Sequence, residues 1–342
     1  RAMDDQQLGI AVVGMGGIGN NHARCYVANP RTKIVAVCDA IKDKADKAGK
    51  DYGCHAFDSI KAMLGAGIKI DAASVCTAGV ENGGDHYAPT MELLAAGVPV
   101  LGEKPISNKI PHAREMVALA KSKSIPYGIN LNHRFTPAAR KAKEWLDATR
   151  CGELNLITML MWINNPNESA EHFHMRALHP HSLDVMRYFV GDAAKVQAFF
   201  KKGKGRKVWS NVQVNILYKS GVVGHLIGSY DGGGPGHPWG LERCEIIGMD
   251  GRIVLKDACE KLEFSPRRKE AGEPEKHEFL GGMKSFGETF QSRIDAWIED
   301  LVKKTPPDQV DGKAEDALKM QLIIEAAIES WDKGTVVEVP AT

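Results

Sequence analysis

One segment near the start of the chain constrains the fold more than any other. Residues 8–14 (LGIAVVG) form a short apolar run that leads directly into the glycine-rich turn GMGGIG at residues 14–19. Residues 17–28 then show helical spacing of apolar and small side chains. A strand that ends in G-x-G-x-x-G and opens a helix is typical of the first unit of a dinucleotide-binding sheet. The segment therefore predicts an α/β fold that begins with such a unit.

The same alternation continues to about residue 131. The next strands are predicted at residues 33–38, 71–76, 98–102 and 127–131, and the helices between them at residues 42–51, 87–96 and 111–123. Strands that alternate with helices imply right-handed crossovers and a parallel sheet. We therefore expect residues 1–131 to form an N-terminal Rossmann domain with a doubly wound parallel sheet.

The pattern changes after residue 132. One predicted helix at residues 138–149 is followed by long strand-like segments and short turns, such as Lys219-Ser220-Gly221, and short turns join antiparallel neighbours. These strands are predicted at residues 154–163, 195–200, 211–218, 222–230, 245–248 and 251–255. Two amphipathic helices are predicted at residues 285–303 and 313–332, and residues 266–276 are predicted as an exposed loop. We expect residues 132–342 to form a C-terminal α+β domain with a large open, mainly antiparallel sheet.

Composition excludes several classes of function. The formal net charge is +1 and no basic stripe is present, which argues against a nucleic-acid partner. No apolar run is long enough to cross a bilayer, and no secretory signal opens the chain. The seven cysteines contain no C-x-x-C pair, so neither a zinc site nor a disulfide framework is indicated. We expect a cytoplasmic protein with no membrane partner.

The glycine turn has the features of a dinucleotide site. In such turns the first glycine permits the tight bend, the second lets the backbone approach the pyrophosphate, and the third lets helix and strand pack closely. The phosphates then lie at a helix N-terminus, whose free N–H groups and dipole favour an anion. The predicted cofactor contacts in this turn are Gly14, Gly16, Gly17, Ile18 and Gly19.

An acidic residue identifies the preferred dinucleotide. Asp39 ends the second predicted strand, at about the 20-residue spacing expected for the acid that binds the adenosine ribose. Its carboxylate would accept hydrogen bonds from the ribose hydroxyls and repel a 2′-phosphate. NAD is therefore the predicted cofactor, although the nearby Lys42 weakens the discrimination against NADP.

Further motifs resemble one family over nearly the whole chain. The run AAGVPVLGEKP at residues 95–105 follows the predicted cofactor strands, and NHRFTP stands at residues 132–137. HSLD at residues 181–184 and IIGMDG at residues 246–251 come later. Together with the glycine turn, these motifs resemble the glucose-fructose oxidoreductase / inositol dehydrogenase / rhizopine catabolism (Gfo/Idh/MocA) family.

The resemblance assigns a catalytic role to Lys104. In the family, the lysine of Glu-Lys-Pro hydrogen-bonds the reacting hydroxyl beside the nicotinamide, and the next peptide is often cis. The chemistry agrees, because a cation beside the oxygen stabilises developing alkoxide charge. The resemblance also suggests cofactor contacts by Glu103, Thr77 and His86, although the loop between Thr77 and His86 is longer than usual in the family.

His181 is the predicted general base, because the ordinary pKa of histidine lies close to the working pH. Pro180 is predicted to start a helix here. Many family members carry an aspartate four residues before this histidine, where the chain has Ala177. Arg176, His179 or Asp184 would then compensate, or the mechanism differs.

Several polar residues are candidates for substrate binding. The turn at residues 231–240 follows a strand and contains His237 and Trp239, and Asn164 and Asn165 end another strand. Aromatic faces and polar tips suit a sugar, although the turn is equally consistent with a simple surface loop. The predicted substrate contacts are Arg134, Asn164, Arg176, Asp184, Tyr230 and His237. Histidines crowd residues 172–181, but without a regular ligand spacing we predict a polar pocket rather than a metal site.

These residues predict an NAD-dependent oxidoreductase that oxidises a secondary hydroxyl of a sugar, glycoside or cyclitol, or reduces the ketone. Two alternatives stay open. One is a glycoside-cleaving enzyme that oxidises transiently and recycles its bound NAD, and the other is a non-catalytic regulator that senses sugar or redox state. Because the predicted second sheet has one face without helices, we expect a homodimer or homotetramer through that sheet.

Overall fold

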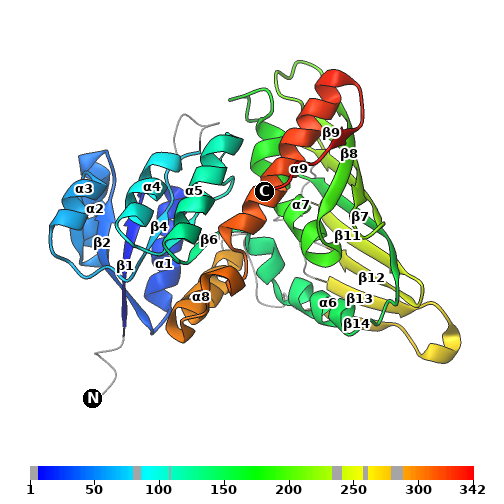
Figure 1. The fold of residues 1–342 in the computed structure, drawn as a ribbon, viewed down its shortest axis with the longest axis horizontal. Helices are drawn as coiled ribbons and strands as arrows, with labels where there is room; N and C mark the ends of the chain where they lie inside the picture. Colours follow the sequence, from blue (N-terminus) through cyan, green and yellow to red (C-terminus); the bar gives the residue numbers. More distant parts are fainter. Residues whose placement is uncertain (1–6, 80–85, 108, 233–240, 257–260, 279–287) are drawn as a thin grey trace. The chain divides into compact units, whose positions relative to one another are not determined.

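The computed structural model describes residues 7–79, 86–107, 109–232, 241–256, 261–278 and 288–342. The chain divides into two compact units (Figure 1). The first unit contains Arg1–Asn130 and Phe290–Leu318, and the second contains Leu131–Thr289 and Lys319–Thr342.

The first unit is built on a parallel sheet with the strand order β3-β2-β1-β4-β5-β6. Its strands are β1 (Leu8–Val13), β2 (Thr32–Cys38), β3 (His55–Phe57), β4 (Ala72–Val75), β5 (Val100–Gly102) and β6 (Tyr127–Ile129). The chain order reverses at β1, which lies between β2 and β4. In open parallel sheets, ligands bind beyond the carboxyl ends of the strands at such a reversal. The predicted Rossmann sheet is confirmed.

Helices connect these strands. They are α1 (Gly17–Ala28), α2 (Lys42–Tyr52), α3 (Ile60–Gly65), α4 (Tyr87–Ala95) and α5 (Ile110–Ser122). Strand β1 is a continuous apolar run, and Ile10, Ala11 and Val12 have no exposed surface. Such runs are typical of parallel strands that are covered on both faces.

A late segment of the chain completes this unit. Helix α8 (Glu288–Lys303) buries Trp297 and Arg293, neither of which has exposed surface. The Nε–H of Arg293 donates to the carbonyl oxygen of Ile129 at 3.1 Å, at the end of β6. This hydrogen bond satisfies a buried cation and ties the edge strand to a helix from the far end of the sequence.

The second unit contains a sheet of nine strands in the order β14-β13-β12-β11-β7-β10-β9-β8-β15. The strands are β7 (Leu154–Trp162), β8 (Ala193–Lys201), β9 (Asn211–Tyr218), β10 (Val223–Ser229), β11 (Leu241–Gly248), β12 (Gly251–Lys256), β13 (Lys261–Pro266), β14 (Glu275–Glu278) and β15 (Val337–Glu338). Among the strands that the structure describes here, only β7 and β10 pair in parallel, so the sheet is mainly antiparallel as predicted.

One face of this sheet is covered by helices. Along β9, buried residues alternate with exposed or half-buried ones, as expected for a sheet with one solvated face. The covering helices are α6 (Pro137–Asp147), α7 (Phe173–Val190) and α9 (Ala314–Lys333) (Figure 1). The 3₁₀ turn η3 (Asn132–Phe135) packs against α6 and α7.

One local prediction was wrong and another was incomplete. Pro180 does not start a helix but lies inside α7, which begins at Phe173 because Phe173, Met175 and Leu178 are buried against the core. Residues 267–274 are exposed as predicted. The predicted loop also includes the 3₁₀ turn η4 (Lys269–Ala271) and, at its end, the start of β14. β14 is a polar edge strand, EKHE, and carries no apolar signal that would reveal it.

Within the part of the chain that the structure describes, no helix is both long and apolar enough to cross a membrane.

Candidate active site

The glycine turn joins β1 to α1 with the geometry that a phosphate cradle requires. Gly14 has φ of +89°, and a Cβ there would lie 2.6 Å from the backbone nitrogen of Thr77. A Cβ on Gly19 would lie 1.8 Å from the carbonyl oxygen of Gly14. Gly16 and Gly17 differ, because a Cβ on either would meet no atom within 4 Å.

The start of α1 is open to a ligand. Gly16 caps the helix without a side-chain hydrogen bond, and the first turn carries no acidic residue. Gly16, Gly17 and Ile18 are exposed. The N–H groups and dipole of this helix end can therefore bind an anion.

This geometry predicts different results for two glycine substitutions. Gly16→Ala should leave the free energy of unfolding within about 0.5 kcal/mol of wild type. It should weaken NADH binding about tenfold or more, because the methyl group occupies the open space beside the helix N-terminus. Gly19→Ala should lower the free energy of unfolding by about 1–3 kcal/mol or more, because the backbone at Gly14 cannot yield. Urea unfolding and NADH fluorescence titration measure both. Equal stability losses in the two variants would contradict the assignment.

Asp39 holds the turn in place at the end of β2. The N–H of Met15 donates to its Oδ2 at 2.8 Å, and the N–H of Ile41 donates to its Oδ1 at 2.9 Å. A carboxylate has about four acceptor positions. Both oxygens therefore keep acceptor capacity after these two bonds, and Asp39 stands at the strand end where a ribose-binding acid is expected.

Lys104 follows β5 at the same edge of the sheet, and the Lys104-Pro105 peptide is cis. The preceding residue, Glu103, is buried. Its Oε1 lies 2.7 Å from Nε2 of His22 and accepts from Nδ2 of Asn130 at 2.6 Å.

Burial and neighbouring charges have opposite effects on the pKa values of Glu103 and Lys104. Burial alone would raise the pKa of Glu103, but the hydrogen bond and charge of His22, with lesser help from Asn130 and Lys104, hold it below its ordinary value. Burial lowers the pKa of Lys104, and the carboxylate of Glu103 only partly offsets this effect. Perturbed pKa values of this kind concentrate at functional sites.

His86 links the loops that follow β4 and β5. Its Nδ1 lies 2.8 Å from the carbonyl oxygen of Pro105, and its Nε2 lies 2.9 Å from that of Thr77. The structure thus places Thr77 and His86 beside the Lys104 loop, and His86 braces that loop through both ring nitrogens. Residues 80–85, between Thr77 and His86, lie outside the described residues.

In the second unit, His181 lies within α7 and is only 5% exposed. The ring of His133, in η3, stacks on it with centroids 4.2 Å apart and planes inclined by 18°. Nδ1 of His133 lies 3.0 Å from Oε2 of Glu242 on β11. A buried imidazole pair and a buried carboxylate therefore converge at this point of the helix.

Arg134 and Asp184 form a buried ion pair beside this cluster. The Nε–H of Arg134 donates to Oδ2 of Asp184 at 2.8 Å, and Nη2 donates to Oδ1. The guanidinium carbon also lies 4.8 Å from the centroid of the Tyr188 ring. A bidentate pair of this kind fixes η3 against α7.

Comparison with known proteins identifies the family of both parts of the chain. A family model described as the oxidoreductase family with an NAD-binding Rossmann fold matches residues 8–131. A second model, the GFO/IDH/MocA C-terminal domain, matches residues 139–254.

The chain belongs to the Gfo/Idh/MocA family.

Several curated members of this family are similar in sequence. Inositol 2-dehydrogenase of Rhizobium meliloti is 26% identical over 93% of this chain and 95% of its own length. D-glucoside 3-dehydrogenase of Escherichia coli is 31% identical, but the match covers 46% of this chain and 44% of that protein. D-apiose dehydrogenase of Rhizobium rhizogenes is 22% identical over 99% of both chains.

Solved structures share the fold. An oxidoreductase from Agrobacterium radiobacter in complex with NAD⁺, L-tartaric acid and magnesium aligns with a TM-score of 0.87 at 21% identity, over 97% of this chain and 98% of that one. Levoglucosan dehydrogenase in complex with NADH and levoglucosan aligns with a TM-score of 0.85 at 19% identity, over 98% of this chain and all of that one.

The first unit therefore carries the NAD-binding Rossmann fold of the family, and its residues fit the cofactor. The space around Gly16 and Gly17, the uncapped start of α1 and the carboxylate of Asp39 match a pyrophosphate and a ribose. The family resemblance had implied a cis peptide after Lys104, and the structure contains it.

The remaining predicted substrate residues lie in different settings. Arg176 donates through Nε to Oε1 of Glu325 at 2.9 Å, and Asn164 is exposed in an isolated bridge with Asp231. Tyr230 is only 2% exposed and packs 4.2 Å from the ring of His174. The predicted contact His237 lies outside the described residues, as does Trp239.

Two of the histidines at residues 172–181, His174 and His179, form a hydrogen-bonded chain. Nε2 of His179 lies 2.9 Å from Nε2 of His174, whose Nδ1 lies 3.1 Å from the carbonyl oxygen of Trp209. Burial lowers the pKa of His174 to about 4 and that of His179 well below its ordinary value. Since a carbonyl only accepts, His174 donates through Nδ1 and His179 donates to His174. Both rings are therefore neutral parts of the core near neutral pH.

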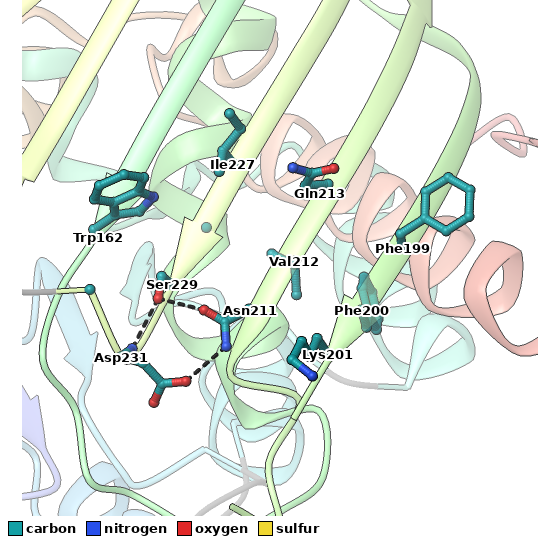
Figure 2. Close-up of a pocket in the computed structure, with 12 residues that line it drawn as sticks. Trp162, Phe199, Phe200, Lys201, Asn211, Val212, Gln213, Ile227, Ser229 and Asp231 are labelled. Carbon is teal, nitrogen blue, oxygen red and sulfur yellow. Dashed lines mark hydrogen bonds between the residues drawn. The ribbon is translucent and has the colours of Figure 1, made fainter. Parts of the chain in front are cut away.

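A hollow of about 510 Å³ opens at one end of β8, β9 and β10 (Figure 2). Trp162 and Phe199 line it with apolar surface. Three of its polar residues are bonded to one another: Nδ2 of Asn211 donates to Asp231 at 2.8 Å, and the hydroxyl of Ser229 donates to Oδ1 of Asn211 at 2.8 Å (Figure 2). With these groups engaged, the hollow offers mainly an apolar surface.

Sequence reasoning missed four functional candidates. His22 contacts Glu103 through Nε2, and its Nδ1 lies 2.9 Å from the hydroxyl oxygen of Ser74. His133 belongs to the quoted NHRFTP motif, but nothing in the motif assigns it a role. Glu242 carries no local signal, because an acidic residue in a strand more often faces solvent.

Proposed function

We propose that the chain oxidises a secondary hydroxyl of a sugar, glycoside or cyclitol with NAD as acceptor, and that the same residues can reduce the ketone. The observation that carries this proposal is the placement of Lys104. It stands at the carboxyl edge of the same sheet as the glycine turn, held by Glu103 and Pro105, with a lowered pKa. The relatives named above for inositol, glucosides and apiose support the substrate class.

In the proposed reaction, bound NAD supplies the acceptor for the hydride from the carbinol carbon. The ammonium of Lys104 donates a hydrogen bond to the hydroxyl oxygen and stabilises the charge that develops on it. His181 accepts the hydroxyl proton as the C–O single bond becomes a carbonyl. One C–H bond and one O–H bond break, and the products are the ketone, NADH and an imidazolium.

We also propose a division of the chain by role. Residues 1–131 hold the cofactor, and residues 132–342 bind the substrate and a second copy of the chain. Arg134 and Asp184 support the wall of the substrate site rather than contact substrate, because both are almost fully buried in their mutual ion pair. Asn164 and the half-buried Arg176 stay as candidate substrate contacts.

A substrate screen tests the proposal. Nicotinamide absorbance is followed across sugars, glycosides, cyclitols and sugar acids, with NAD and NADP in parallel. We expect NADH to accumulate with at least one secondary alcohol. Release of an aglycone without NADH would instead indicate transient oxidation with a recycled cofactor. Flat traces from a protein that binds NADH would contradict the dehydrogenase.

Asp39→Asn should reduce the preference for NAD over NADP by about tenfold, the equivalent of about 1.4 kcal/mol. The substitution removes the negative charge that opposes the 2′-phosphate. It should also lower the free energy of unfolding by about 1 kcal/mol, because the amide keeps only one of the two acceptor oxygens that bind the N–H groups of Met15 and Ile41. Asp43→Asn, at an exposed position in α2, is the matched control. An unchanged ratio of kcat/KM for the two cofactors would remove Asp39 from the ribose site.

The open face of the second sheet is proposed to bind a second copy of the chain. Large apolar side chains on this face are exposed: Phe199 by 55%, Leu217 by 41% and Val223 by 49%. Apolar patches of this kind mark association surfaces. Sedimentation should show a dimer or tetramer. The double variant Phe199→Asp/Leu217→Asp should shift the equilibrium toward the monomer. A wild-type monomer at micromolar concentration would refute this interface.

A further inference from the structure

A buried carboxylate and two stacked imidazoles form a chain of contacts that ends on the proposed base. The three groups come from η3, α7 and β11, all in the second unit. His133 is 2% exposed, Glu242 is 2% exposed and His181 is 5% exposed. The stacked rings are 4.2 Å apart, and the imidazole–carboxylate contact is 3.0 Å.

Burying a carboxylate is costly unless a partner compensates it. A solvent-facing acid at this place in the strand would avoid that cost, as Glu245 does three residues further along β11. Glu242 instead points to the helix-covered side of the sheet, as the buried Cys244 and Ile246 do. The contact with His133 offsets part of the cost of burying the Glu242 carboxylate.

Two physical effects reach His181 through this contact. The hydrogen bond with Glu242 fixes the plane of the His133 ring, and the parallel stack then restricts rotation of the His181 ring about its Cβ–Cγ bond. In the low dielectric of a buried site, the carboxylate charge also acts on His181, whose ring stacks on the ring that the carboxylate contacts. That charge favours the imidazolium that forms when His181 accepts a proton.

Other charged groups lie on α7, which carries His181, and on the elements near it. Asp184 is paired with Arg134, Arg176 with Glu325, and His179 with His174. Each of the three residues expected to compensate for Ala177 thus has a strong partner. Among the described residues, the titratable and charged groups on α7, η3, α6, α9 and β11 include Arg176, His179, Asp184, His133, Arg134, Arg140, Glu325 and Glu242.

We propose that His133 and Glu242 are positioning residues for His181, with the His133 ring fixing the orientation of the base and the Glu242 carboxylate supplying the negative charge that Ala177 cannot. The inference rests on the proposed role of His181 as the base. It extends that role to a residue that lies 109 positions from His133 in the sequence and has no recognisable motif around it.

The test is a titration of His181 that needs no substrate. The ring ¹³Cε1–¹H signals of the full-length protein are followed against pH, and the His181 signal is assigned by its loss in His181→Asn. Glu242→Gln should lower the pKa of His181 by about one unit, since loss of a nearby buried negative charge destabilises the imidazolium. Glu245→Gln, on the solvent face of the same strand, should leave it unchanged. An unchanged His181 titration in folded Glu242→Gln would overturn the proposal.

A second variant covers the case in which Glu242→Gln does not fold. His133→Phe keeps a flat ring against His181 but cannot bond the carboxylate, so it should change the His181 titration, and an unchanged pKa would again overturn the proposal. Once a substrate is known, the acid limb of the kcat/KM profile should move to lower pH in Glu242→Gln, with Glu242→Asp intermediate and KM little changed. If no alcohol is oxidised but the titration shifts as expected, the proposed function fails while the coupling stands.

Discussion

Replacing Lys104 with methionine is expected to reduce kcat by about 10²–10³-fold, the usual loss when one donor to a developing oxyanion is removed. Methionine keeps most of the volume of the side chain and removes its charge. NADH binding should stay within a few-fold of wild type, because the cradle around Gly16 is unaltered. Stopped-flow absorbance with the substrate found in the screen measures the chemical step, and NADH titration measures binding.

The charge of Lys104 also predicts the alkaline limb of the pH profile. Burial lowers its pKa below the ordinary 10.5. The ammonium is the active form, so activity should be present below this lowered pKa and fall as the pH rises through it. The limb should therefore lie below pH 10.5 and be absent in Lys104→Met. Lys109→Met, at an exposed lysine five residues on, is the matched control. Full activity in Lys104→Met would remove Lys104 from the reaction.

His181→Asn is expected to reduce kcat by about 10²–10⁴-fold, the range over which a positioned general base accelerates proton transfer. Asparagine preserves polarity and hydrogen bonding but cannot accept the proton at neutral pH. The acid limb of the profile should disappear with the base, while cofactor binding remains.

The matched control is His225→Asn, at a partly exposed histidine on β10 whose Nδ1 bonds to Asn215. It should leave kcat unchanged. Restoration of His181→Asn by added imidazole would support the role further. A His181→Asn enzyme with wild-type kcat and an intact acid limb would show that another group takes the proton.

Much of the first unit could be predicted from the sequence, because its signals are local. β1, the glycine turn, α1 and Asp39 lie within one stretch, and each residue type has a physical reason for its place. β3 was missed because it is only three residues long, His55–Phe57, and none of the three is fully buried. Short strands contribute too few residues for a period to be recognised.

The packing of α8 could not be predicted. An arginine in an amphipathic helix usually belongs to the solvated face, yet Arg293 has no exposed surface and bonds to a carbonyl 164 residues earlier in the chain. Only the tertiary fold provides that carbonyl. The sequence pattern therefore predicts the helix but not the unit in which it packs.

The same limit applies to the candidate site. His181 was found through the resemblance and through the chemistry of imidazole, both of which are properties of a short segment. The contact between His133 and Glu242 joins residues from η3 and β11 that no motif connects. The burial of Arg134 and Asp184 in one ion pair likewise cannot be read from either residue alone.

The most direct test of the central claim follows the hydride itself. The substrate is prepared with deuterium on the carbinol carbon and mixed with excess enzyme and NAD for a single turnover, and the nicotinamide is analysed by mass spectrometry and NMR. We predict that the deuterium appears at the C4 position of the reduced nicotinamide in wild type, and that Lys104→Met slows its appearance. Turnover of substrate with no deuterium in the nicotinamide would contradict hydride transfer to NAD.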